Sequence, residues 1–330
     1  MKNKIRLVIL IIIISILLSI TVVYAAIKYN SADVLINKQT GLFSNNLEDA
    51  IDELDALIKS PTNCPSKTMT CKKDAYICKR ATTLHTATCS QDAGSCNNVE
   101  GYNKTITFGQ LGTTGVLRPG DAFDCKVSTT GGYTERFYYV SDYYDTQLKK
   151  FNSEVAVLIY YTYTYNGSAS ESVVHYDDSG ENWHGPQTAV THLPTTSSWN
   201  NINLYKSKRK ILTENNSTST TGGTLPRDFS YEGKAARLLT YQELYNACYT
   251  NEKKITYAFS INNCTFLFEK TDYVRSGTPY RWWLETPESS NDHYIYYLGA
   301  SNRNISSITP DYNYNGVRPV IEVLKSDISY

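Results

Sequence analysis

The chain has 330 residues, and its 32 Lys and Arg residues balance its 32 Asp and Glu residues, so the formal net charge is zero. A neutral chain has neither a basic field that attracts nucleic acid nor a strongly acidic field, so we expect no nucleic-acid partner. Tyr is unusually frequent, with 28 residues against 9 Phe and 4 Trp. Tyr rings suit half-buried strands as well as exposed contact surfaces, and we expect most of them to fill strands.

The N-terminus predicts export. Lys2, Lys4 and Arg6 precede an apolar run that extends to residue 27. A membrane-spanning helix needs about 20 apolar residues, whereas the apolar region of a signal peptide has about 7–15. The length therefore favours an uncleaved anchor over residues 1–27, although Val23-Tyr24-Ala25 also fits a cleavage site. The basic residues stay in the cytoplasm, so the bulk of the chain is expected outside a single-pass cell membrane, or secreted after cleavage.

Residues 28–60 are expected to form a short helical stalk. Apolar residues recur there at helical spacing on one stripe, at Leu47, Ile51, Leu54 and Ile58. A helix of about 12 residues is marginal by itself, so this stripe needs a partner. The partner is either the globular domain or the same helix in another copy, which would make the protein a homo-oligomer.

The chain contains eight Cys residues, and an even number in an exported chain indicates disulfides. Structural zinc favours Cys pairs separated by two to four residues, and the closest pairs here have six residues between them, so no metal site is expected. Residues 61–101 hold five Cys and few apolar residues, which predicts a disulfide-linked segment. Its pairing is open, and one of its Cys is expected to bond Cys125 or another chain. The residues concerned are Cys64, Cys71, Cys78, Cys89, Cys96 and Cys125. Cys248 and Cys264 are predicted to form a disulfide, with two buried free thiols as the alternative.

From residue 102 onward, short strands alternate with Gly, Ser and Thr turns. Expected strands include 105–108, 137–140, 155–161, 294–298 and 317–323, of which 155–161 has the continuous apolar pattern of a buried strand. Helices are expected at 185–193 and 240–248, and Thr240 with Glu243 predicts a capping box at the start of the second. These elements predict an α+β domain over residues 102–330.

Three motifs in this domain carry a resemblance to a known family. They are Ala236-Arg237-Leu238-Leu239-Thr240-Tyr241-Gln242-Glu243-Leu244, Trp282-Trp283-Leu284-Glu285-Thr286 and Gly316-Val317-Arg318-Pro319-Val320. In this order they resemble the formylglycine-generating-enzyme-like branch of the C-type-lectin fold, with Leu239 in place of the usual Pro. Gly180 to Pro186 also resembles bacterial surface modules of this type, and residues 44–57 resemble a segment that precedes such modules.

The resemblance implies a bacterial surface domain whose C-terminal loops bind the ligand. The residues at matching positions are Tyr294, Tyr296, Asn302, Arg303, Asn304, Tyr312 and Tyr314. Trp282 and Trp283 are adjacent, so in a strand they point to opposite faces, and one of them is a candidate surface for stacking on a sugar ring. The expected function is therefore binding of a carbohydrate or protein ligand. The alternative is a structural or assembly protein of the cell envelope.

An exported enzyme of the same family has less support. The cysteine oxidases of the family hold copper on a late Cys pair, and this chain has no Cys after Cys264. Its five His residues show no close ligand pair, which leaves no cofactor expected. A Ser/His/Asp triad stays open at this point, because its members need not be neighbours in sequence.

One calcium-loop pattern is present, from Asp311 through Gly316 to Glu322. In a calcium loop the side chains of Asp311 and Glu322 converge on one ion. The residues before Glu322 read as a strand, which would carry its side chain away from Asp311. We therefore interpret the pattern as a Tyr/Asn turn before the last strand.

Overall fold

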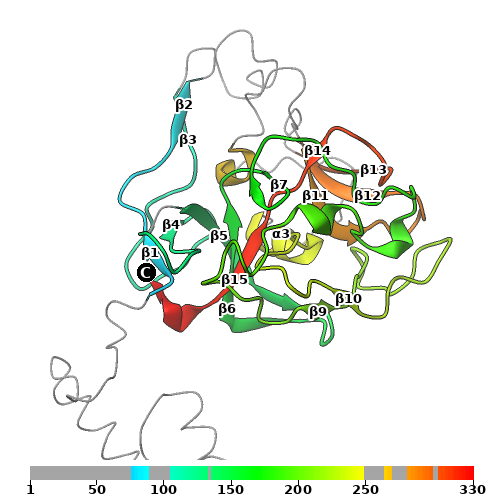
Figure 1. Cartoon of the computed structure of the whole chain (residues 1–330), viewed down its shortest axis with the longest axis horizontal. Helices are drawn as coiled ribbons and strands as arrows, with labels where there is room; N and C mark the ends of the chain where they lie inside the picture. The colour runs from blue at the N-terminus through cyan, green and yellow to red at the C-terminus, as the bar shows by residue number, and fades with distance from the viewer. Residues whose placement is uncertain (1–75, 89–104, 133–134, 249–263, 270–280, 300–303) are drawn as a thin grey trace, which may run out of the picture. The chain divides into compact units, whose positions relative to one another are not determined.

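Two β-sheets organise the part of the chain that the structure describes (Figure 1). The computed structural model describes residues 76–88, 105–132, 135–248, 264–269, 281–299 and 304–330. All of them belong to one unit, Ala75–Tyr330. The predicted anchor (1–27) and stalk (28–60) lie outside the described residues. Within the described ranges, no helix is long and apolar enough to cross a membrane.

The larger sheet has six strands in the order β15-β6-β5-β4-β1-β16. Their bounds are β15 (Val320–Leu324), β6 (Lys150–Tyr160), β5 (Glu135–Asp145), β4 (Ala122–Cys125), β1 (Cys78–Arg80) and β16 (Ile328–Ser329). Neighbours are antiparallel except β1 and β16, which are parallel. β1 comes from the segment predicted as a Cys-rich linker, and here it pairs with both β4 and β16.

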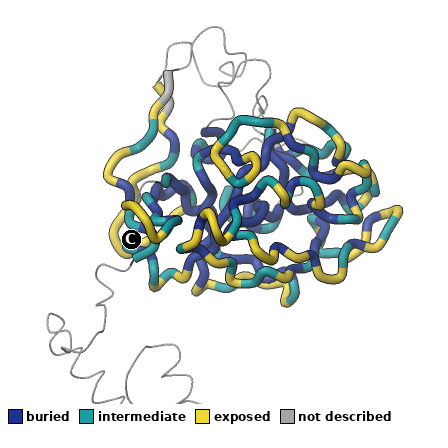
Figure 2. The backbone as a smooth tube through the Cα atoms, in the orientation of Figure 1, coloured by how far each residue is buried: buried dark blue, intermediate teal, exposed yellow. Residues whose placement is uncertain are grey.

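The prediction of a buried strand at 155–161 is confirmed by β6, whose C-terminal half is buried on both faces. Val155, Val157 and Ile159 pack into one hydrophobic cluster. Ala156, Leu158 and Tyr160 pack into a second cluster on the opposite face. Successive side chains of a strand point to opposite faces, so a strand covered on both sides is apolar at every position. Buried backbone follows this sheet through the interior, and exposed backbone is concentrated in the outer loops (Figure 2).

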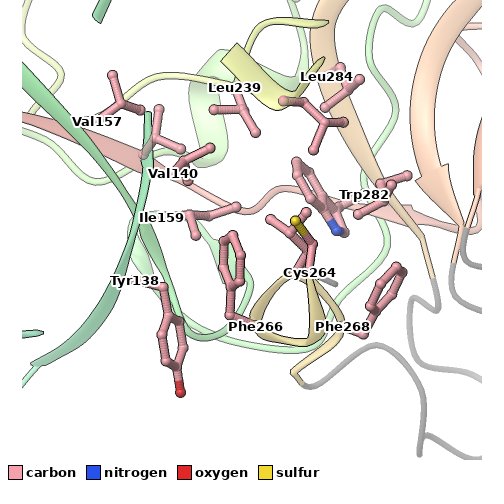
Figure 3. Packing of buried hydrophobic residues seen from close by; sticks show 14 of the residues in the cluster. Tyr138, Val140, Val157, Ile159, Leu239, Cys264, Phe266, Phe268, Trp282 and Leu284 are labelled. Atoms are coloured by element: carbon pink, nitrogen blue, oxygen red, sulfur yellow. The ribbon is translucent and has the colours of Figure 1, made fainter. Parts of the chain in front are cut away.

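The smaller sheet has four strands in the order β13-β12-β11-β14. They are β13 (Asn304–Ile308), β12 (Ile295–Gly299), β11 (Arg281–Pro287) and β14 (Asn315–Gly316). Trp282 and Leu284 of β11 face the cluster that contains Val157 and Ile159, which the smaller sheet shares with the larger one (Figure 3). Trp283 faces a third cluster on the opposite side, with Tyr176, Phe229 and Ile295 among its members.

Three short strand pairs complete the β-structure. They are β2 (Thr86–Thr88) with β3 (Thr105–Thr107), β7 (Thr164–Tyr165) with β8 (Ser168–Ala169), and β9 (Lys208–Arg209) with β10 (Phe229–Ser230). The strands predicted at 105–108, 137–140, 294–298 and 317–323 correspond to β3, β5, β12 and β15.

The α+β prediction with several helices is wrong, because the described residues form a mostly β fold. α3 (Tyr241–Cys248) is their only α-helix, and the remaining helical turns are 3-10 turns. These are η3 (Asn182–His184), η4 (Ala189–His192), η5 (Thr265–Phe268) and η6 (Lys325–Asp327). The helix predicted at 185–193 is reduced to η4. Gly185 has φ 78°, outside the helical region, and Leu193 is extended, as is favoured for a residue that precedes a proline.

The predicted start of α3 is confirmed as a capping box. The backbone N–H of Glu243 donates to Thr240 Oγ1 at 3.2 Å, and the backbone N–H of Thr240 donates to Glu243 Oε2 at 3.2 Å. The disulfide between Cys248 and Cys264, which joins the end of α3 to the residue before η5, is also confirmed. A second disulfide joins Cys78 of β1 to Cys125 of β4. Cys64, Cys71, Cys89 and Cys96 lie outside the described residues.

The first motif of the resemblance supplies the centre of a buried ionic network. Arg237 is fully buried, and it donates to Glu243 through two nitrogens at 2.9 and 2.6 Å and to Glu322 through Nε at 2.5 Å. Burial by itself would lower the pKa of Arg237, but Glu243 and Glu322 outweigh it and raise that pKa well above its usual value. Conversely, Arg237 holds the pKa of Glu243 below its usual value despite burial.

The second and third motifs supply further interior polar groups. Glu285 of β11 lies 3.3 Å from Arg209 and accepts from the Tyr231 hydroxyl at 2.9 Å. Arg318 is buried, and it donates to the carbonyl oxygens of Tyr160, Leu267 and Phe266 at 2.6, 2.5 and 2.9 Å. Burial lowers the pKa of Arg318 to about 10. The motif residues therefore build the interior of the domain.

Candidate functional site

Both predicted Trp residues lie in the core. Trp282 and Trp283 are each 0% exposed, so neither is available as a surface for stacking on a ligand. They do point to opposite faces of β11, but both faces of the smaller sheet are covered. Trp283 Nε1 donates to the Val174 carbonyl at 2.6 Å, and the Arg318 guanidinium lies 5.8 Å from the Trp282 ring.

The predicted ligand-binding Tyr residues do not form one surface. Tyr296 packs on Tyr241 of α3, with ring centroids 5.2 Å apart, next to the core shared by the two sheets. Tyr312 packs beside the cluster on the opposite side of the smaller sheet, and its ring lies 5.1 Å from Tyr314. Tyr294 and Tyr314 are exposed. Asn302 and Arg303 lie outside the described residues, and Asn304 begins β13.

The interpretation of the calcium-loop pattern as a turn is confirmed. Glu322 lies in β15, where its carboxylate accepts from Arg237 and from the backbone N–H of Tyr205 at 2.7 Å. Asp311 instead lies beside Gly180, 3.7 Å from where a Cβ on that glycine would be. The two carboxylates therefore do not converge on one ion.

The structure brings Ser179, His184 and Asp177 together, but not as a catalytic triad. Ser179 Oγ and Asp177 Oδ2 both lie 2.8 Å from the same ring nitrogen, His184 Nδ1, and Ser179 Oγ also donates to Asp177 Oδ2. A triad places its serine and its carboxylate on opposite ring nitrogens, so that the histidine can take the serine proton. This arrangement orders the loop and does not activate the serine.

Two side chains of this loop, Glu181 and Trp183, form the candidate site with Asp292 and His293. These four residues are here called the Trp183 cluster. Trp183 Nε1 donates to Glu181 Oε2 at 3.1 Å. His293 contacts both carboxylates, through Nδ1 to Glu181 Oε2 and through Nε2 to Asp292 Oδ1, each at 3.5 Å. Trp183 is 36% exposed, and its ring packs on His184 at 3.8 Å.

Asn182 holds together the two loops that carry the cluster. Its backbone N–H donates to the Asp292 carbonyl at 2.9 Å. Its side-chain Nδ2 donates to the carbonyls of Asn291 and Tyr294 at 2.6 and 2.9 Å. Asn182 is fully buried, and its hydrogen bonds join η3 to the turn before β12.

Two glycines of a third loop lie against the cluster. A Cβ added at Gly222 would lie 1.6 Å from Asp292 Oδ2, and a Cβ at Gly223 would lie 2.9 Å from Trp183 Cγ. Only a residue without a side chain permits so close an approach. The end of the run of Ser, Thr and Gly before residue 224 is therefore packed against Asp292 and Trp183.

Gly185, which ends η3, sets the direction of the chain after Trp183. Its φ is +78°, and a Cβ there would lie 2.7 Å from the Phe229 ring. Gly233 has a φ of +76° and open space around its Cβ position. We expect Gly233→Ala to cost about 1 kcal/mol of unfolding free energy from backbone strain, and Gly185→Ala to cost about 1–3 kcal/mol more from the clash. Chemical denaturation of both variants measures this difference, and equal costs would contradict it.

An exposed aromatic ring fixed beside two carboxylates suits a ligand with an apolar face and hydroxyl groups. The indole face can stack on C–H groups, while Glu181 and Asp292 can accept hydrogen bonds from hydroxyls. Both carboxylates are part-exposed, with side-chain exposures of 32% and 31%. These residues come from separate loops, and the only signal for them in the sequence was the motif that contains Trp183.

Comparison with known proteins identified no relative of this chain. No family model matches the chain, and neither a curated protein nor a solved structure matches it. The resemblance to the formylglycine-generating-enzyme-like branch therefore stays a prediction.

Proposed function

We propose that this chain is an exported surface protein that binds a carbohydrate through the Trp183 cluster. The observation that carries the proposal is the exposed Trp183 ring, which Glu181, His184 and Gly223 hold in place. A ring fixed before the ligand arrives loses little conformational freedom on binding, and such rigid aromatic residues dominate many binding surfaces.

Export is supported by features outside the cluster. The apolar run that ends at residue 27 follows three basic residues. Two disulfides in the described residues, Cys78–Cys125 and Cys248–Cys264, are typical of proteins that fold in an oxidising compartment. Residues 1–27 would hold the protein in the membrane, or would be removed after secretion.

The test is a screen of the full-length protein, purified in mild detergent with its disulfides formed, against a glycan array and against intact bacterial and host cells. We expect Trp183→Ala to weaken binding at least about tenfold, which is about 1.4 kcal/mol. Trp183→Phe keeps a ring but loses the bond to Glu181, and should retain part of the affinity.

The control is Tyr205→Ala. Tyr205 is more exposed than Trp183, at 48%, and its ring packs on Tyr143 of β5, with centroids 5.5 Å apart. Removal of this tyrosine should leave glycan binding unchanged. Binding that survives Trp183→Ala would place the ligand elsewhere, and binding to cell-surface proteins alone would replace the carbohydrate with a protein ligand.

A further inference from the structure

Two carboxylates and one imidazole converge on the exposed edge of the Trp183 cluster. One ligand atom from each of Glu181, Asp292 and His293 lies within 4.8 Å of the others. Ligand atoms on a tetrahedral zinc ion are about 3.4 Å apart, given bonds of about 2.0–2.1 Å. Small side-chain rotations of these part-exposed residues would therefore bring the three groups onto one ion.

In the part of the chain that the structure describes, no Lys or Arg balances the charge of Glu181 and Asp292. Among the described residues, neither Glu181 nor Asp292 is paired with Lys or Arg, and His293 is the only partner of either in an ion pair. Other carboxylates of the domain differ in this respect, as with Asp145, which lies 2.6 Å from Lys206 Nζ. Two adjacent carboxylates that have no Lys or Arg partner among the described residues attract a cation.

The loops that carry these ligands also contain two buried oxygen atoms that have no hydrogen-bond donor among the described residues. Asn182, which joins the loops of Glu181 and Asp292, is fully buried, and its Oδ1 has no hydrogen-bond donor. Glu288, at the start of the loop that carries Asp292, is 5% exposed, and its Oε2 also lacks a donor.

We propose that Glu181, Asp292 and His293 bind one divalent transition-metal ion of the zinc class. The imidazole favours such an ion over calcium or magnesium, which prefer oxygen ligands. Three protein ligands leave a coordination position open to water or to a ligand hydroxyl. The ion would lie beside Trp183, because Glu181 Oε2 contacts both His293 and the indole N–H.

The proposal is tested by calorimetric titration of ZnCl2 into the full-length protein in mild detergent, after a thiol assay has shown that all cysteines are oxidised. Co²⁺ absorption spectra report the ligand set independently. We expect one ion per chain, and we expect His293→Ala and Asp292→Asn each to weaken binding about tenfold or more. Both side chains are part-exposed, so thermal melting of these variants should match the wild type.

The matched control is His175→Ala. His175 contacts one carboxylate, Asp178, at 2.7 Å, so it forms an exposed imidazole–carboxylate pair without a third ligand. Removal of His175 should leave the titration unchanged. An absence of saturable zinc binding, or binding that persists in His293→Ala, would overturn the proposal. The titration contains no glycan, so its failure is separate from a failure of carbohydrate binding.

Discussion

Replacement of Arg237 by Met should lower the free energy of unfolding by about 3–5 kcal/mol. The substitution removes the guanidinium that contacts Glu243 and Glu322 and leaves these two carboxylates buried. A buried charge that loses its partner costs more than the pair contributed, because the remaining group keeps its full desolvation penalty. Urea denaturation of wild type and variant measures the loss.

The control for this prediction is Lys325→Met. Lys325 contacts Asp142 at 2.7 Å, but both side chains are part-exposed, so the change should cost less than about 1 kcal/mol. Equal losses in the two variants would contradict the importance given to the buried network.

The pH dependence provides a second check on Arg237→Met. Because Arg237 lowers the pKa of folded Glu243, the stabilisation from this pair is present above the unfolded pKa, about 4.3, and is lost as the pH falls through the folded value. In the variant, protonation removes an unpaired buried charge. Burial without Arg237 raises the pKa of folded Glu243 in the variant, so the difference in stability between wild type and variant should begin to shrink above about pH 4.3 and should shrink further below it.

Removal of the two described disulfides should have the next largest effects. Cys78 and Cys125 are 47 residues apart in sequence, and Cys248 and Cys264 are 16 apart. A cross-link that closes a longer loop removes more entropy from the unfolded chain. We expect the double Ala variants to lose about 4 and about 3 kcal/mol, in that order.

Denaturation of the two double variants under identical conditions gives this ranking. A larger loss on removal of Cys248–Cys264 would contradict it, and would mean that native-state contacts around α3 outweigh the effect on the unfolded chain. Each variant should be compared with the oxidised wild type.

Local patterns predicted five of the sixteen described strands and one helix. The apolar run of β6 and the capping box of α3 depend on neighbours within a few residues, and both appear where the sequence places them. The predicted helix at 185–193 is only a 3-10 turn, because Gly185 and Leu193 on either side of it have non-helical backbone angles. The expectation of several helices followed from the same error, since the polar segments between the strands form irregular loops.

The site was harder to predict, because its geometry depends on contacts between distant segments. Trp282 and Trp283 are adjacent in sequence, but only the packing on both sides of the smaller sheet shows that both are core residues. The loops that carry Trp183, Gly223 and Asp292 are about 40 to 110 residues apart in sequence. A local sequence pattern cannot predict a contact between segments so far apart.

The bridge between β1 and β4 also determines how the domain would carry mechanical load. Traction on the chain ahead of Cys78 passes through a covalent bond into Cys125, and from there into the middle of the larger sheet. The hydrogen bonds between β1 and its neighbours do not have to bear that tension, so β1 cannot be peeled away while the bridge is oxidised. A reducing environment would remove this protection, and resistance to a pull on the chain ahead of Cys78 would then depend on the hydrogen bonds of the three-residue strand β1.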